Sequence, residues 1–108
     1  MRPALLFLAA LPLCAQNIGI DSHIDTVQRV LIDRADLTPR STAGHVDIPR
    51  LREGGVNAPF FALWVPTYYK GAEAVRRTLD LRDAIEHLFD THPEQIALAL
   101  TARMSSGS

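Results

Sequence analysis

The sequence has 108 residues, of which 47% are hydrophobic and 21% charged, with a formal net charge of −1. This is the composition of an ordinary globular protein, and it excludes an intrinsically disordered or fibrous chain. The 11 basic and 12 acidic residues nearly balance and are interspersed. No basic surface for nucleic acid or for an anionic membrane is therefore expected.

The first sixteen residues differ from the rest of the chain. They run from Arg2 through an uncharged, apolar stretch at 4–13 to small residues around Ala15. This order predicts a secretory signal peptide over residues 1–16, cleaved after Ala15 or Gln16, and hence export to the periplasm or the exterior. The apolar stretch is shorter than the ~20 residues that a membrane-spanning helix needs, so no transmembrane segment is expected.

Two alternatives remain open for this segment. One is a buried N-terminal strand or helix, and the other is a lipoprotein signal that uses Cys14. Leu13 disfavours the second alternative, because it is bulky where such a signal has a small residue. Cys14 is the only cysteine and would leave with the signal. The exported chain must then rely on His, carboxylates, hydroxyls or metal rather than on thiols or disulfides.

The first half of the exported chain contains one predicted strand and two short predicted helices. Apolar and polar side chains alternate over residues 18–25, the period-two pattern of a strand. A short helix is expected after Thr26, followed by a loop over residues 38–50 that is interrupted by Pro and Gly. Residues 48–55 fit one or two helical turns, with a proline at the start and a glycine at the end.

The second half contains a second strand and the clearest helix. Residues 56–65 show little alternation, so both faces of this strand are expected to be buried, as in a parallel sheet covered by helices. Pro59 cannot donate to the ladder, so the start of the strand is expected to be displaced or bulged. Apolar residues recur on one face over residues 73–90, and Pro93 ends this helix. Residues 96–100 form either a short third strand or an extended connector.

The order of these elements predicts an α/β sheet or barrel. Two or three buried parallel strands do not protect both faces and both edges of a sheet, and a (β/α)₈ barrel needs about 250 residues. The sequence therefore reads as part of a larger fold. The last four residues, 105–108, have nothing to pack and are expected to be disordered.

His23-Ile24-Asp25, at the end of the first strand, is the sharpest candidate for chemistry. Side chains two residues apart on a strand project from the same face. An imidazole and a carboxylate placed in this way can bind a divalent ion such as Zn²⁺. Taken alone, the spacing is a weak signal, because a zinc site needs three or four ligands. The same spacing also recurs at His45-Val46-Asp47.

Four segments together resemble the membrane dipeptidase family (renal dipeptidase, peptidase family M19). They follow the order and spacing of that family from about Asn17 to Thr101, which is far more specific than any one motif. In chain order, residues 20–25 resemble its D-G-H-N-D segment, residues 44–56 its H-T-D-I-P-R-L-R-x-G-G-V signature, residues 60–66 its Q-F-W-S-V-Y-V-P strand, and residues 73–79 the helix that comes next.

The resemblance implies a (β/α)₈, TIM-like metallo-hydrolase barrel that uses two zinc ions, or another divalent metal, to hydrolyse dipeptides. It implies that His23 and Asp25 bind one of these ions and that neither is the nucleophile. The glutamate and the histidines that complete the family's site lie on segments that follow the matched part. Residues 17–102 are therefore expected to be the N-terminal part of a barrel, with 103–108 as a tail. We expect the chain to be a truncated segment that is inactive alone.

The remaining histidines are not expected to bind metal. The family does not use the pair His45 and Asp47 as ligands, and Asp47 is suited to cap the short helix, so we interpret this pair as structural. His87 and His92 lie on and after the long helix, where the helix dipole favours solvent-facing histidines. The alternative function is a non-catalytic exported binding or interaction module derived from the same fold.

Overall fold

The computed structural model describes residues 17–101, which form a mixed α/β arrangement. The predicted signal peptide and the predicted disordered tail lie outside these residues. In chain order, the elements are β1 (Gly19–Ile24), α1 (Val27–Ile32), α2 (Ile48–Glu53), β2 (Val56–Phe61) and α3 (Ala72–Thr91). Each helix and both strands lie within a residue or a few residues of the predicted positions.

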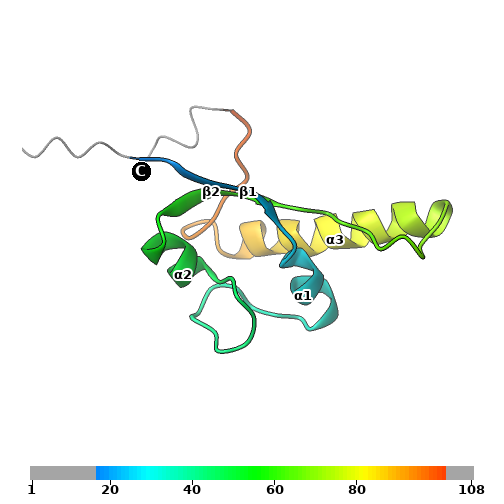
Figure 1. Cartoon of the computed structure of the whole chain (residues 1–108), viewed down its shortest axis with the longest axis horizontal. Coiled ribbons are helices and arrows are strands. Elements are labelled where there is room, and N and C mark those ends of the chain that lie inside the picture. The colour runs from blue at the N-terminus through cyan, green and yellow to red at the C-terminus, as the bar shows by residue number, and fades with distance from the viewer. Residues whose placement is uncertain (1–16, 102–108) are drawn as a thin grey trace, which may run out of the picture.

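β1 and β2 pair in parallel and form a two-stranded sheet (Figure 1). The register shifts twice, and Pro59 lies between the two shifts, opposite Asp21. Proline has no N–H to give to the ladder, so regular pairing cannot run through this position. At the first shift β2 contains an extra residue, Asn57, whose Oδ1 accepts a hydrogen bond from the Gly19 N–H at 2.7 Å. The strand starts at Val56 as predicted, and the bulge expected near Pro59 is confirmed.

The hydrophobic core lies between α1 and α3, on one side of the sheet. Figure 1 shows the helices on the same side of the two strands. The buried core residues are Val27, Leu37, Leu81, Ile85 and Leu88. Three of them lie on α3, at the three- and four-residue spacing that gives a helix one apolar face. Within residues 17–101, no helix is both long enough and apolar enough to cross a membrane.

The structure corrects the expected end and burial of the second strand. β2 ends at Phe61 rather than at residue 65, and Phe60 is 61% exposed, so the two faces of this strand are not both buried. In β1, Ile20 is 63% exposed, whereas Ile24 is buried. Residues 96–100 form a connector, one of the two expected alternatives, and no strand. The common cause is that helices cover one face of a sheet that, in the described part of the chain, has only two strands.

Candidate metal site

The end of β1 is fixed by its neighbours on both sides. Ile24, the last residue of the strand, is buried, and its carbonyl oxygen accepts a hydrogen bond from the Ala62 N–H at 2.8 Å. The carbonyl oxygen of Asp25 accepts the N–H of Gln28 at 3.0 Å and so begins the turn into α1. Since β1 and β2 are parallel, this point lies at the edge of the sheet where both strands end. Ile24 is thus anchored, and its two neighbours in the chain, His23 and Asp25, start from a fixed backbone.

The side chains of His23 and Asp25 converge on each other. His23 Nε2 lies 3.0 Å from Asp25 Oδ1, and the two side chains are 61% and 59% exposed. The backbone N–H of His23 also donates to Asp21 Oδ1 at 3.1 Å, which fixes the strand just before the pair. The structure thus brings together the two residues that the sequence indicates as ligands. Their role as metal ligands stays a prediction.

The pair fits a zinc site in donor type and spacing but not in number. Two ligands of one tetrahedral zinc ion lie about 3.3 Å apart, close to the separation of His23 Nε2 and Asp25 Oδ1. Among residues 17–101, no group of three or more His, Cys, Asp or Glu side chains is placed to hold a metal. Outside this range the sequence offers only Cys14 as a further side chain of these types. The described residues therefore offer two of the three or four ligands that a zinc site needs.

The pair lies in an open hollow with a volume of about 360 Å³. Asp21, His23 and Asp25 line it from the β1 side. Arg29 of α1 and His45 of the loop between α1 and α2 also line it. A hollow of this size lies at the small end of the range of ligand sites.

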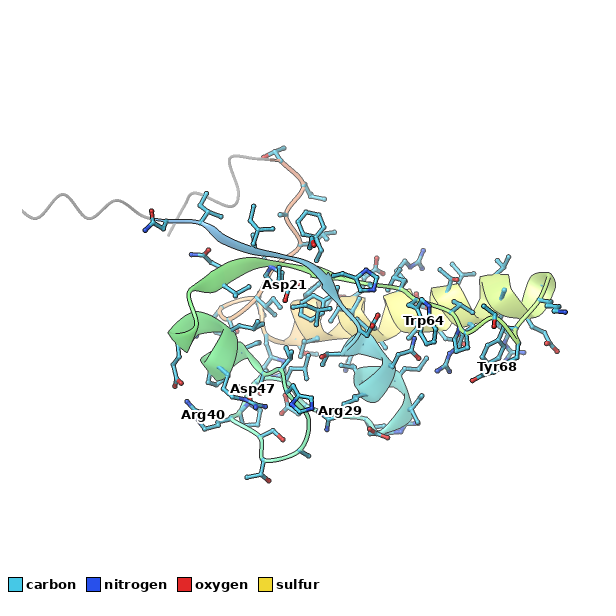
Figure 2. All side chains as sticks on the ribbon, in the orientation of Figure 1. Asp21, Arg29, Arg40, Asp47, Trp64 and Tyr68 are labelled. Atoms are coloured by element: carbon cyan, nitrogen blue, oxygen red, sulfur yellow. The ribbon has the colours of Figure 1, made fainter. Side chains whose placement is uncertain are left out.

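Asp47 holds together the loop between α1 and α2, which contributes Gly44, His45 and Val46 to the hollow. Its side chain is completely buried, and its Oδ1 accepts the N–H of Arg50 at 2.9 Å, which makes Asp47 the N-cap of α2. Its Oδ2 accepts the N–H of Ser41 at 2.9 Å and the Nε–H of Arg50 at 2.6 Å. The predicted capping role of Asp47 is confirmed. Figure 2 shows Asp47, Arg40 and Arg29 around this loop.

The same contacts set the charge state of Asp47. Burial alone would raise the pKa of its carboxyl group, because removal from water disfavours the charged form. The backbone N–H groups of Ser41 and Arg50, together with the Arg50 guanidinium, stabilise the carboxylate and outweigh burial. The pKa of Asp47 is lowered from 3.8 to about 2. The loop is thus held by a carboxylate that is ionised at neutral pH.

His87 and His92 belong to a different place in the structure. They line a second hollow, with a volume of about 570 Å³, between α1 and α3. His87 is exposed, as expected, whereas His92 is half-buried and not fully solvent-facing. Asp36 lines the same hollow; hydrogen bonds from the N–H and hydroxyl of Thr38, together with the proximity of His92, lower the pKa of its carboxyl group. This larger hollow contains neither His23 nor Asp25.

Sequence reasoning did not identify Arg29 and His45 as neighbours of the metal pair. His45 was interpreted together with Asp47 as structural, but the structure separates the two residues. Asp47 is buried under the loop, while His45 is exposed and lines the hollow. The H-x-D spacing carries no information on this difference, because the loop between α1 and α2 has no repeating pattern that fixes side-chain directions.

Comparison with known proteins identifies the family. No solved structure matches the chain. The model of the family described as membrane dipeptidase (Peptidase family M19) matches residues 8–105. The match extends over almost the whole sequence and contains all four segments on which the resemblance was based. The chain therefore belongs to the membrane dipeptidase family, peptidase family M19, and the match is consistent with a fragment of that family.

Proposed function

We propose that this chain supplies His23 and Asp25 as ligands of the metal centre in a zinc-dependent dipeptidase. The observation that carries the proposal is the 3.0 Å convergence of His23 Nε2 and Asp25 Oδ1 at the carboxyl end of β1. Active sites of (β/α)₈ barrels lie at the carboxyl ends of the strands. The parallel pairing of β1 with β2, and the long helix that follows, are the arrangement expected of such a barrel's first two units.

In this proposal, His23 and Asp25 hold the ion in place, and neither of them attacks the peptide bond. When bound, zinc polarises the peptide carbonyl and makes water a stronger nucleophile. His23 and Asp25 fix where the ion sits relative to the hollow, and Asp21 holds the backbone of His23. His23 Nε2 and Asp25 Oδ1 form a hydrogen bond with each other in this structure, so an ion held by both atoms would replace that hydrogen bond.

We also propose that this chain contains only part of the metal site and that the protein is exported. With only two ligands from residues 17–101, zinc would bind weakly and without fixed geometry, so we expect no dipeptide hydrolysis by the 108-residue chain alone. Residues 17–102 act as the N-terminal part of the barrel, whose other strands would cover the open sheet edges. The apolar segment that precedes them supports export by a signal peptide.

A chimera tests the catalytic role of the segment. Residues 17–101 replace the corresponding segment of a complete member of the membrane dipeptidase family, and hydrolysis of glycyl dipeptides is followed with added zinc. We expect the chimera to be active. The change His23→Ala should lower its kcat/KM by at least about 100-fold, because a direct metal ligand is lost.

The matched control is His87→Ala in the same chimera, because His87 is exposed and lies in the other hollow. This variant should keep the activity of the parent chimera. A chimera that folds and hydrolyses dipeptides equally well with His23→Ala would contradict the proposal. A folded chimera that binds zinc through other residues and hydrolyses nothing would favour the alternative, a non-catalytic binding module.

A further inference from the structure

The loop that carries His45 is held by hydrogen bonds to the two residues that precede it. Arg29 Nη1 donates to the carbonyl oxygen of Ala43 at 2.9 Å, and Arg50 Nη2 donates to the carbonyl oxygen of Gly44 at 3.2 Å. Each arginine is paired with a carboxylate: Asp33 lies 3.6 Å from Arg29 Nε, and Asp47 contacts Arg50. Two carbonyl groups in a row before His45 are thus fixed by charged donors that are themselves held.

Gly44 permits this arrangement through its backbone conformation and its lack of a side chain. Its φ angle is 75°, in the left-handed region that disfavours residues with a Cβ atom. A Cβ atom at this position would lie 1.9 Å from Arg29 Nη1. The loop therefore packs directly against the guanidinium of Arg29. His45, although exposed, starts from a backbone that has little freedom to move away from the hollow.

The hollow is lined by groups of both charges. Asp21 and Asp25 of the β1 end contribute carboxylates, whereas Arg29 of α1 and His45 of the loop contribute a guanidinium and an imidazole. A dipeptide carries a positive amino group at one end and a carboxylate at the other. Arg29 and His45 can donate hydrogen bonds to a carboxylate, because a guanidinium carries N–H groups and a neutral imidazole always has one N–H.

We propose that His45 is a substrate-contacting residue whose imidazole N–H binds the terminal carboxylate of the dipeptide. This inference rests on the proposed function, since it places the peptide between His45 and the metal pair. Arg29 is a positioning residue: its guanidinium holds the loop through the Ala43 carbonyl oxygen and adds positive charge to the same hollow. The role follows from the placement of His45 on a held loop within the hollow that contains His23 and Asp25.

Magnetic resonance of the four histidines in the 108-residue chain tests this inference. With substoichiometric Mn²⁺, the imidazole signals of His23 and His45 should broaden, while those of His87 and His92 stay sharp in the other hollow. With zinc present, glycylglycine should shift the His45 signal saturably, and its C-terminal amide, which lacks the carboxylate, should not. His45→Ala should weaken glycylglycine binding by about tenfold, and His45→Gln, which keeps an N–H donor, should restore part of it.

The outcomes separate this inference from the proposed function. Broadening of His23 with no effect of Mn²⁺ or glycylglycine on His45 would overturn the inference and leave the metal role of His23 standing. No broadening of any histidine would overturn the proposed metal site, and the inference with it. A His92→Ala control should bind glycylglycine like the parent, and equal weakening by His92→Ala and His45→Ala would also overturn the inference.

Discussion

Replacing His23 by alanine is expected to weaken zinc binding to the 108-residue chain by about 100-fold or more. The described part of the chain offers the ion two converging side chains, so the loss of either leaves one exposed ligand. Asp25→Asn should have a similar effect, because the amide keeps the shape but loses the negative charge that attracts the ion. Calorimetric titration with Zn²⁺ near neutral pH measures both variants.

The control for this result is His87→Ala, which removes an exposed imidazole of α3 that does not line the hollow of the pair. Its zinc affinity should equal that of the parent. Equal zinc affinity in the parent and in His23→Ala would show that the ion binds elsewhere.

Replacing Asp47 by alanine is expected to lower the midpoint of thermal unfolding by about 8–15 °C. The change removes three hydrogen bonds to a completely buried carboxylate, one of which is the N-cap of α2. It also leaves the Arg50 guanidinium, whose side chain is only 29% exposed, without its ion-pair partner. Differential scanning calorimetry checks the shift. Arg82→Ala, which breaks only exposed ion pairs on α3, is the matched control and should change the midpoint little.

The same carboxylate predicts a pH dependence of stability. The pKa of Asp47 is about 2 in the folded chain, against 3.8 for a free side chain. A lowered pKa means that the ionised form is favoured by folding, so its contribution is present above about pH 4 and is lost as the pH falls toward about 2. Asp47→Asn cannot ionise, so it should lose stability less steeply than the parent over this window. Identical slopes in the two proteins would contradict the role of the ionised carboxylate.

The elements that depend on local pattern could be predicted from the sequence. The 3.6-residue spacing of apolar side chains placed α3 to within one residue at each end, since the prediction was 73–90 and the helix is Ala72–Thr91. The proline near the start and the glycine at the end of α2 defined that helix because they act through their own backbone geometry. Pro59 indicated the irregular pairing of β1 and β2 for the same reason.

The exposure of strand residues could not be predicted in the same way. An apolar side chain at Ile20 or Phe60 fits a buried strand, but burial depends on which other segments cover the face. The absence of a strand at 96–100 has the same origin, because a strand needs a neighbouring edge with which to pair. These properties belong to tertiary packing, and no pattern within a few residues determines them.

The candidate site was only half predictable. His23 and Asp25 were found because strand alternation places residues two apart on one side, and their convergence at 3.0 Å fits that rule. His45 is distant from the pair in sequence and reaches the hollow through an irregular loop that Arg29 and Arg50 hold by hydrogen bonds. Arg29 follows Asp25 closely in sequence, on α1, but the strand pattern ends before it and does not predict its side-chain direction. The position of His45 depends on the hydrogen bond from Ser41 to Asp47 and on the left-handed backbone of Gly44. No spacing rule predicts either feature.

X-ray absorption at the zinc edge, on the chain loaded with less than one equivalent of zinc, identifies the atoms that bind the ion. We expect one imidazole nitrogen in the first coordination shell, from His23, with oxygen in the other positions, and no imidazole signal in His23→Ala. Sulfur in the shell, or an imidazole signal that survives His23→Ala, would contradict the assignment of His23 and Asp25 as the metal ligands of this chain.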